Sequence, residues 1–574
     1  MPSEPQTADH AVPEAFDSSA DVIVIGAGPT GCTYARTIID EAPDARVLLV
    51  EAGPAATVPP GLHVANIESS SHRTAVQIAF QGPFPHAYPK LSHDEVARAD
   101  HETLNATLTK RPGLWSLAEP SGPSDFPAAQ ASSGVGGMGS HWFGACPRPA
   151  GSERIDLIAR EVLDDAYDEA ERMLRVGNDR FTDRRMAERI RSRISRVVDD
   201  GREPSRRVQQ MPMALVATPT GVHRSGPDVI LGDAVDRGLE VRADTLARRI
   251  LMEGGRAVGV VLEDRLTGRM TSVSARHVVV AANSVHTPQL LFASGIRPAA
   301  LGRHLNEHPQ VSLMAVLEDG DALGDVSDAA GTADGESGTT GVMSDPSAMA
   351  IASSGVTWIP FDGDRFPFHS QVSHVDPTTL GLSDAEVATL GPVISLAFFL
   401  PQELDPENRV WFSETETDWR GMPAPRFRYR LSVGDRRVIA RAKETLKDIA
   451  NSLGRPLKAE EPRELPAGSS LHYQGTVRMG ATDDGASVCD PGSRVWGTEN
   501  VRVAGNGVIP TSTACNPTLT SVALAIIGAR AIADELRHKE KTCVSEHPFG
   551  RGNGMAPTTE RSRASATRAS VQPS

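Results

Sequence analysis

The stretch Asp21-Val-Ile-Val-Ile-Gly-Ala-Gly-Pro-Thr-Gly31 decides the fold of this chain. Its first five residues form a short apolar run rich in β-branched side chains, which is typical of a strand buried on both faces of a parallel sheet. Three glycines spaced G-x-G-x-x-G follow at once, and residues 32–41 have a helical pattern. A second apolar run over 45–51 completes a predicted β-α-β unit of about 30 residues.

Such a unit predicts a dinucleotide site. Gly26 allows the tight turn, Gly28 lets backbone N–H groups approach a pyrophosphate, and Gly31 lets the helix pack closely on the strand. The positive end of the helix favours the anion. Glu51 lies 20 residues beyond Gly31, where a carboxylate accepts ribose hydroxyls and repels a 2′-phosphate. FAD or NAD is therefore favoured over NADP, and the position of the unit near the N-terminus, followed by Glu51-Ala-Gly53, favours FAD.

Composition excludes several classes of protein. The 574 residues include 58 Lys and Arg against 73 Asp and Glu, so the net charge is −15, which disfavours a nucleic-acid partner. No apolar run approaches the ~18–20 residues of a membrane span. Residues 1–20 lack the charged and apolar parts of a secretory signal, and the five cysteines form no C-x-x-C pair. We therefore expect a cytoplasmic protein with neither a membrane nor a nucleic-acid partner.

The predicted fold class is α/β, with a Rossmann-like FAD-binding domain built on a parallel sheet and an interleaved α+β substrate domain built on an antiparallel sheet. Residues 151–215 have helical spacing, and residues 318–345 form an acidic, glycine-rich loop or insertion. The predicted division is a disordered arm over 1–20, an FAD-binding domain over 21–150, 216–310 and 480–540, a substrate-binding domain over 151–215 and 311–479, and a disordered tail over 541–574.

Several further segments resemble the glucose/methanol/choline (GMC) family of flavin oxidoreductases, in particular its pyranose oxidase branch. Val135-Gly-Gly-Met-Gly-Ser-His141-Trp142 is similar to the segment in which pyranose 2-oxidases bond a histidine to the flavin. Residues 282–291 resemble a strand-to-helix segment near the cofactor. The segments 367–371, 408–413 and 421–427 look like parts of the substrate domain, and 471–480 and 516–520 look like the catalytic segments.

The resemblance implies an FAD site, with covalent attachment through His141 left open. It implies His472 and Asn516 as catalytic residues, which would contact the substrate together with Gln371, and no metal. The implied cofactor-binding residues are Gly26, Gly28, Thr30, Gly31, Glu51, Gly137, Met138, Ser140, His141, Ala247, Ala282, Asn506, Gly507, Asn516, Pro517 and Thr518.

The chemistry of alcohol oxidation agrees with this assignment. Removing a hydroxyl proton and transferring the carbinol hydride to a flavin requires one proton acceptor and one polar partner for the developing alkoxide. His472 can accept the proton because a neutral imidazole titrates near ~6.5. Asn516-Pro517 suits the N-cap and first positions of a final helix, whose positive end would face the flavin.

A different motif, His304-Leu-Asn-Glu-His308, has the H-x-x-E-H spacing of a zinc peptidase. That site needs both histidines on one face of a continuous helix. Gly302 and Pro309 flank the segment, so no long helix is expected here and no zinc site is predicted.

The resemblance fails at some positions. Pyranose 2-oxidases typically carry a threonine near the flavin where this chain has Phe143, which leaves either oxygen or a quinone as the electron acceptor. A histidine and an aspartate of the sugar-binding loop are replaced by Ser373 and Val375. We therefore expect oxidation at C2 or C3, with C3 favoured, of a pyranose sugar or a glycoside with a partly apolar group. The alternatives are a dehydrogenase with a quinone acceptor, a flavin-holding lyase of the same fold and a binding protein without catalysis.

Overall fold

The structure is a computed structural model. It describes residues 15–83, 111–117, 124–178, 184–218, 221–318, 355–375 and 384–545, together with residues 12, 13 and 377. Most of the predicted N-terminal arm, all but the first residue of the predicted acidic loop, and the predicted tail beyond residue 545 lie outside the described residues. Among the described residues, no helix combines the length and hydropathy needed to cross a bilayer.

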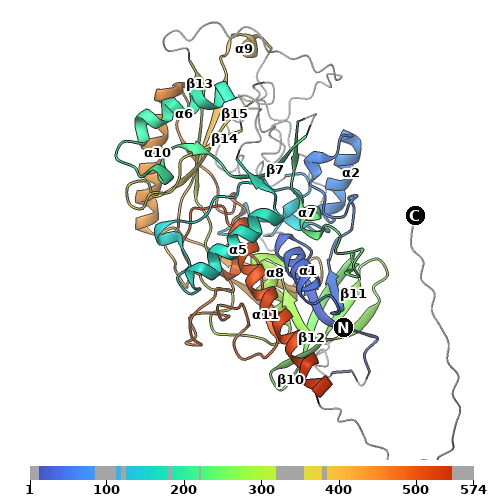
Figure 1. The fold of residues 1–574 in the computed structure, drawn as a ribbon. Coiled ribbons are helices and arrows are strands. Elements are labelled where there is room, and N and C mark those ends of the chain that lie inside the picture. Colours follow the sequence, from blue (N-terminus) through green and yellow to red (C-terminus); the bar gives the residue numbers. More distant parts are fainter. Residues whose placement is uncertain are drawn as a thin grey trace, which may run out of the picture.

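The first sheet has seven strands and contains the β-α-β unit near its centre (Figure 1). From one edge its strands are β10 (Thr245–Glu253), β11 (Arg256–Asp264), β12 (Met270–Val280), β1 (Ser18–Ile25), β2 (Val47–Val50) and β9 (Glu240–Arg242), and β21 (Val501–Val503) pairs with β12. The central pairs are parallel, whereas β10, β11 and β12 pair antiparallel. β1 starts three residues earlier than predicted, so residues 18–20 of the predicted arm belong to the sheet.

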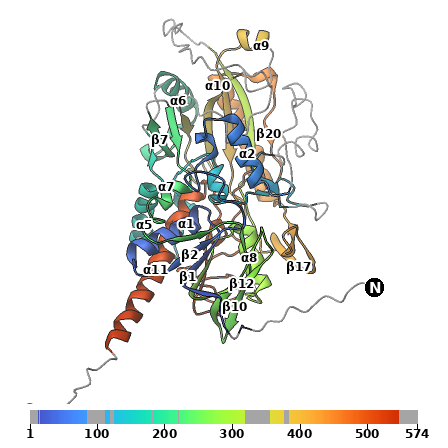
Figure 2. The same ribbon diagram turned by 90° about the vertical axis from the view of Figure 1, so that its right-hand side faces the viewer.

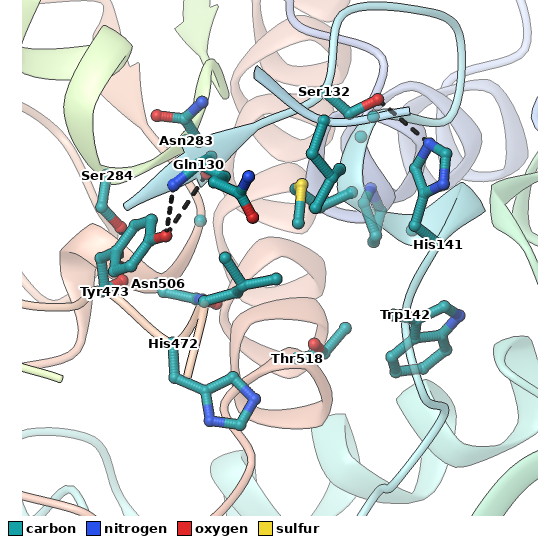
Figure 3. A pocket seen from close by; sticks show the side chains of 18 of the residues that line it. Gln130, Ser132, His141, Trp142, Asn283, Ser284, His472, Tyr473, Asn506 and Thr518 are labelled. Atoms are coloured by element: carbon teal, nitrogen blue, oxygen red, sulfur yellow. Dashed lines mark hydrogen bonds between the residues drawn. The ribbon is translucent and has the colours of Figure 1, made fainter. Parts of the chain in front are cut away.

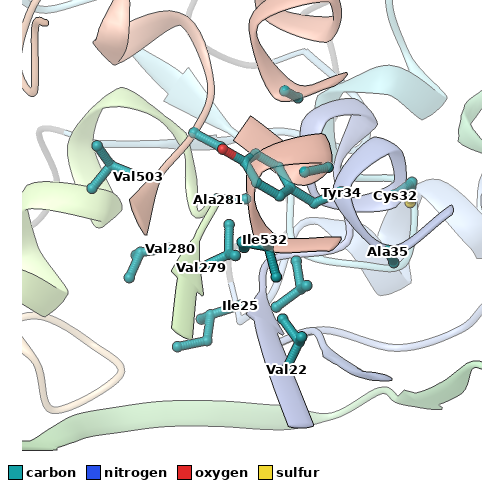
Figure 4. Packing of buried hydrophobic residues seen from close by; sticks show 14 of the residues in the cluster. Val22, Ile25, Cys32, Tyr34, Ala35, Val279, Val280, Ala281, Val503 and Ile532 are labelled. Carbon is teal, nitrogen blue, oxygen red and sulfur yellow. The ribbon is translucent and has the colours of Figure 1, made fainter. Parts of the chain in front are cut away.

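Helices α1 (Pro29–Glu41) and α11 (Thr518–Ser545) pack together and share one apolar core with the first sheet (Figure 4). Val22, Val279 and Ile532 are fully buried in this core, and each such side chain stabilises the fold by ~1.5–3 kcal/mol. The two helices come close because Gly528 has no side chain. A Cβ atom there would lie 1.9 Å from the hydroxyl oxygen of Tyr34. The core therefore fixes the start of α11 against the β-α-β unit.

The second sheet also has seven strands, and all of its pairs are antiparallel. Its strands are β19 (Gly454–Pro456), β13 (Gln310–Leu317), β16 (Val393–Phe399), β15 (His369–Val375), β14 (Val356–Trp358) and β6 (Gln209–Gln210), with β20 (Arg463–Glu464) paired to β13. Helices α10 (Val433–Leu453) and α6 (Arg184–Val198) pack over one of its faces (Figure 2). The opposite face is free to line a site.

Smaller helices and strands lie outside the two seven-stranded sheets. They are α2 (Ser70–Phe80), α5 (Arg160–Met173), α7 (Pro227–Leu231), α8 (Asn283–Ala293), α9 (Asp384–Thr389), β3 (Trp115–Ser116), β4 (Gln130–Ala131), β5 (Val176–Gly177), β7 (Met213–Thr218), β8 (Gly221–Arg224), β17 (Arg409–Thr417) and β18 (Pro423–Arg428).

The α/β fold class, with one parallel-centred and one antiparallel sheet, is confirmed. α5 lies in the range assigned to the substrate domain, yet it packs on α11 and contributes to the first core. α6, from the same range, packs on α10 beside the second sheet. α11 continues to Ser545, five residues into the predicted tail. The proposed division of the chain into domains stays a prediction.

Candidate active site

A cavity of about 480 Å³ is lined by residues from both sheets. Figure 3 shows His141, Thr518 and His472 among the side chains that line it. One end is formed by the glycine turn after β1, the end of β2 and the start of α8. The other end is formed by β13, β15 and β16 of the second sheet. His472 and the residues just before α11 lie where these two ends meet. The cavity therefore brings together segments from the start, the middle and the end of the chain.

The three glycines of the turn have different surroundings. Gly26 has a φ of +103°, and a Cβ atom there would lie 2.5 Å from the carbonyl oxygen of Ala281. A Cβ atom on Gly31 would lie 1.8 Å from the carbonyl oxygen of Gly26, so Gly31 closes the turn against the helix. A Cβ atom on Gly28 would meet no protein atom within 4 Å and would project into the cavity. The space beside Gly28 thus suits a ligand that approaches the backbone closely.

Glu51 lines the cavity beside this turn and is 8% exposed. Its carboxylate accepts hydrogen bonds from the backbone N–H groups of Ala27 (3.0 Å) and Gly53 (3.1 Å). Burial raises the pKa of this carboxyl group, and the backbone N–H groups partly oppose the increase. Glu51 therefore supports the glycine turn from within, in addition to its predicted role toward a ribose.

His141 lies across the cavity, in the turn that follows the short 3₁₀-helical segment Gly137–Ser140. Its Nε2 atom is 3.2 Å from the hydroxyl oxygen of Ser132, and its buried Nδ1 atom has no hydrogen-bond partner among the described residues (Figure 3). Burial lowers the pKa of His141 to about 4. The ring is thus neutral near pH 7, and one of its nitrogens has no hydrogen bond among the described residues.

These features fit a dinucleotide such as FAD. Gly28 leaves an open cradle, and the first turn of α11 contributes Thr518 and Ser521 to the cavity wall. Nδ1 of His141, a residue of the cavity wall, is a buried polar atom without a partner among the described residues. A bound ligand can satisfy such an atom, whereas leaving it unpaired costs about 1–3 kcal/mol.

The predicted catalytic residues lie next to each other. The side-chain nitrogen of Asn516 is 3.3 Å from Nε2 of His472, and its side-chain oxygen accepts a hydrogen bond of 3.1 Å from Gln371. α11 begins at Thr518, one residue later than predicted, so Asn516 is not the N-cap residue of this helix. Its amide instead joins β15 to the loop that carries His472. Both Asn516 and His472 line the cavity.

A second layer of residues supports His472 from behind. Its Nδ1 atom is 3.0 Å from Nδ1 of His308, and the rings are nearly perpendicular. The backbone N–H of His472 donates to the hydroxyl of Ser470, which donates to the buried carboxylate of Glu307 (2.7 Å). Leu471 has a φ of +59°, a left-handed conformation that costs about 1–2 kcal/mol for a residue with a side chain. These contacts hold a strained turn in place.

The charges around His472 keep its ring neutral. Burial is the main reason that the pKa of His472 falls to about 3, and the positive charge of Arg111 lowers it further. Arg111 also lines the cavity and donates to the carbonyl oxygen of Ser469 (3.2 Å), while its Nε has no partner among the described residues. A neutral His472 can accept a proton at any pH near neutrality.

The floor of the cavity follows from the two-residue period of the second sheet. Ser312, Ala397 and Gln371 are paired across three strands, and Ser395 pairs with Ser373 two residues further along. All five line the cavity, whereas the alternating residues of the same strands, such as Leu313 and Leu396, pack under α10. The ring of Phe399 lies against His472, with centroids 5.5 Å apart. The floor is thus uncharged and carries hydroxyl and amide groups beside one aromatic ring.

Most predicted site residues lie together in the cavity wall. The residues in contact with it are Gly26, Gly28, Thr30, Glu51, Gly137, Met138, His141, Ala247, Ala282, Gln371, His472, Asn506, Asn516 and Thr518. The residues that lie outside the wall are Gly31, Ser140, Gly507 and Pro517. Ser373 lines the floor, but Val375 is buried in a separate apolar cluster with Val316.

Sequence reasoning missed part of the site. The alternation of Gln310 and Ser312 with Val311 and Leu313 in β13 was a signal for the floor, but Arg111 had none. The segment His304–His308 forms no helix, as predicted. Among the residues that the structure describes, no group of three or more His, Cys, Asp or Glu side chains could hold a metal ion.

Comparisons with known proteins agree with this site. The family model described as GMC oxidoreductase matches in two parts, over residues 130–310 and 405–525. A model described as lycopene cyclase protein matches residues 21–71, which contain the β-α-β unit. The chain is 41% identical to a C-glycoside 3-oxidase of Arthrobacter globiformis, over 91% of this chain and 96% of that protein.

More distant relatives agree as well. A pyranose 2-oxidase of Tricholoma matsutake is 30% identical over 90% of this chain and 94% of its own length. The crystal structure of a pyridoxine 4-oxidase from Mesorbium loti has the same fold, with a TM-score of 0.56 at 17% identity, over 89% of this chain and 99% of that one. The glycine turn, the His472–Asn516 pair and the agreement over nearly the whole length lead to one conclusion. This chain belongs to the GMC oxidoreductase family.

Proposed function

We propose that this chain is an FAD-dependent oxidase that converts one ring hydroxyl of a pyranose sugar or glycoside into a ketone, at C2 or C3, with C3 favoured. Members of the GMC oxidoreductase family are FAD flavoproteins. Relatives named C-glycoside 3-oxidase are 41% and 42% identical to this chain, and more distant ones are named pyranose 2-oxidase. The single observation that carries the proposal is the His472–Asn516 pair, placed between the glycine cradle and the uncharged floor.

The pair can perform the reaction on one hydroxyl group. Nε2 of neutral His472 accepts the hydroxyl proton, while the amide N–H of Asn516 donates to the same oxygen and stabilises the developing alkoxide. FAD, when bound, supplies the acceptor for the hydride that leaves the carbinol carbon. The substrate thus loses one proton and one hydride, and oxygen takes up the two electrons and two protons to form hydrogen peroxide.

The other predicted residues have proposed roles as well. The turn at Gly26–Gly31 and the start of α11 would bind the pyrophosphate and flavin of FAD, and Glu51 the ribose. Gln371 would hold both Asn516 and the sugar, and the serine hydroxyls of the floor would bind sugar hydroxyls. No charged side chain from β13, β15 or β16 lines the cavity, which favours an uncharged substrate. The ring of Phe399 favours a glycoside with a partly apolar group. The replacement of the histidine and the aspartate of the sugar-binding loop by Ser373 and Val375 favours the same kind of substrate.

We further propose that His141 bonds covalently to the flavin. The support is its place in the cavity wall, its neutral ring and its unpaired nitrogen. Forming the link replaces a C–H bond of the flavin and the N–H bond of the imidazole by one C–N bond, so it releases two protons and two electrons, and oxygen is the proposed acceptor of both, forming hydrogen peroxide. Precipitation with acid should leave the yellow colour in the pellet, and His141→Ala should move it to the supernatant. Colour that leaves the wild-type protein on precipitation would contradict the link.

There is a second candidate for the electron acceptor. Phe143 lines the cavity where a hydroxyl side chain would assist oxygen, which favours a quinone or another acceptor instead. The names of the relatives favour oxygen. Turnover measured with oxygen and with benzoquinone, at equal concentrations, separates the two.

The deciding experiment is anaerobic. The purified holoprotein should lose its flavin absorbance near ~450 nm when mixed with pyranoses or with aryl O- or C-glycosides, and analysis of the product should place the new ketone at C3 or C2. A flavin that stays oxidised with all sugars and glycosides but is bleached by simple primary alcohols would overturn the proposal. A flavin that is never bleached while the glycoside is cleaved would support the lyase alternative.

A cytoplasmic location is also proposed. Cys32, Cys146, Cys489 and Cys515 are buried free thiols, which fits a reducing compartment. Recovery of the native protein in the membrane or secreted fraction of the source cells would contradict this.

A further inference from the structure

The segment Glu307-His308, which belongs to the rejected zinc motif, contacts the loop that carries His472 at two places. The carboxylate of Glu307 accepts hydrogen bonds from the backbone N–H of Gly468 and from Ser470, and so holds the loop before His472. The ring of His308 meets the ring of His472 at Nδ1. Both residues are at most 2% exposed, so water does not compete for these bonds.

The contact between the two rings restricts where their protons are. A hydrogen bond between two neutral imidazoles needs one N–H donor and one acceptor nitrogen. If His308 donates, His472 carries its own proton on Nε2, and this atom cannot accept a proton from the substrate. If His472 donates, its proton is on Nδ1 and Nε2 is free to act as the base. Only the second arrangement is compatible with the proposed reaction.

The far side of His308 allows this arrangement. If His308 accepts at Nδ1, its own proton is on Nε2 and must find an acceptor. Nε2 is 3.2 Å from the hydroxyl oxygen of Thr513 and 2.8 Å from the side-chain nitrogen of Gln474, and the amide oxygen must take the place of that nitrogen for Gln474 to accept. An amide can present either its nitrogen or its oxygen by rotating through 180°. Both ends of Gln474 also reach the hydroxyl of Thr513, so the rotated amide keeps its partners.

From this geometry we infer that His308 is a positioning residue that sets the tautomer of His472. His472 donates from Nδ1 to His308, and His308 donates from Nε2 to the rotated amide of Gln474, so that Nδ1 of His472 carries the proton and Nε2 faces Asn516 without one. When Nε2 takes the hydroxyl proton, His308 accepts a hydrogen bond from the charged ring and stabilises it. The neutral imidazole does here what a carboxylate does behind other catalytic histidines.

The inference rests on the proposed function, because it takes His472 as the base. The charged or titratable groups that face the pair are Arg111, His369 and Glu307. His369 belongs to a separate hydrogen-bonded unit, with Trp358 on one ring nitrogen and Glu153 on the other. Among the described titratable groups, His308 is the one whose side chain lies at hydrogen-bond distance from the ring of His472.

The test compares His308→Leu with His308→Gln in the FAD-loaded protein. Glutamine can accept a hydrogen bond from Nδ1 of His472, and leucine cannot. We expect leucine to slow flavin reduction at saturating sugar at least about tenfold, and by no more than the ~10²–10⁴-fold of general base catalysis, with the half-saturating sugar concentration unchanged. Glutamine should restore the rate to within a few-fold of wild type. His277→Gln, which removes another buried histidine outside the cavity wall, should leave the rate unchanged.

A spectroscopic measurement needs no turnover. With ¹⁵N-labelled histidine and His472 assigned by its alanine variant, the wild type and His308→Gln should show His472 protonated on Nδ1. Equal rates for wild type and His308→Leu, equally slow rates for leucine and glutamine, or a proton on Nε2 in the wild type would each overturn the inference. If His308→Leu does not fold, the glutamine variant and the ¹⁵N spectrum of the wild type still decide whether His308 sets the tautomer of His472. If no sugar reduces the wild-type flavin, the proposed function fails, and the tautomer can still be determined.

Discussion

Nε2 of His472 and the side-chain nitrogen of Asn516 lie 3.3 Å apart, although 44 residues separate them in the chain. His472 is carried by a loop held from behind by Glu307 and His308. Asn516 lies just before α11 and is held by Gln371 from the second sheet. The pair therefore forms only when both cores are folded around the cavity. Each of its two residues can be substituted while the other is kept.

His472→Ala should slow anaerobic reduction of the flavin by sugar ~10²–10⁴-fold, because the hydroxyl proton loses its acceptor. Stopped-flow absorbance measures this rate. The flavin content should stay near that of the wild type. His72→Ala, which changes an exposed histidine on α2, is the control. A variant at His472 that reduces its flavin at the wild-type rate would remove this residue from the chemistry.

The rate of flavin reduction should vary little between about pH 5 and pH 9. A base works only when unprotonated, and burial holds the pKa of His472 at about 3, so protonation should abolish the rate only as the pH falls toward that value. An ordinary histidine would lose half the rate near pH ~6.5. Burial raises the pKa of Glu307 to about 7, so ionisation of this carboxyl group should add a small step in the rate of flavin reduction near pH ~7. The step should vanish in Glu307→Gln.

Gly28→Ala and Gly31→Ala should fail in different ways. A methyl group on Gly28 meets no protein atom, so the variant should fold with an unchanged melting temperature when FAD is absent, but bind FAD more weakly. A methyl group on Gly31 would collide with the backbone of Gly26, so this variant should lose stability by about 1–3 kcal/mol or more. Thermal unfolding and flavin titration of both variants check this. Unaltered FAD affinity in Gly28→Ala would argue against the cradle.

Gln371→Met should lower kcat/KM for the sugar about tenfold, because the amide oxygen of Asn516 loses a hydrogen bond worth about 1 kcal/mol and the substrate loses a polar contact. Steady-state kinetics with the best glycoside measures the change. Gln209→Met, in β6 of the same sheet and outside the cavity wall, should behave as wild type. Equal losses in both variants would indicate a general effect on the sheet.

Phe143→Thr should raise kcat/KM for oxygen relative to that for benzoquinone, because it places a hydroxyl group in the cavity wall where this chain has an aromatic ring. The two constants are measured at a fixed, saturating sugar concentration, so the reaction with sugar serves as the internal control. An unchanged ratio would show that Phe143 does not govern the choice of acceptor.

The parts of the site that the sequence predicted are local in the chain. The β-α-β unit and its three glycines lie within about 30 residues, so spacing alone is informative. The His472–Asn516 pair came from a resemblance of short segments. His308 was missed because its partner His472 is 164 residues away, and its own motif pointed to a metal. Ser312 and Ser395 were missed because their shared face depends on the pairing of β13 with β16.

By itself, the sequence determined the α/β fold class and the glycine turn for a dinucleotide, since each depends on residue type and short-range spacing, while a resemblance of short segments indicated the His472–Asn516 pair. The tertiary structure alone decided which residues surround that pair. The low pKa of His472, the contact at its Nδ1 atom and the uncharged floor all arise from burial and from neighbours distant in the chain. Burial and long-range contacts are properties of the folded chain, and no local pattern encodes them.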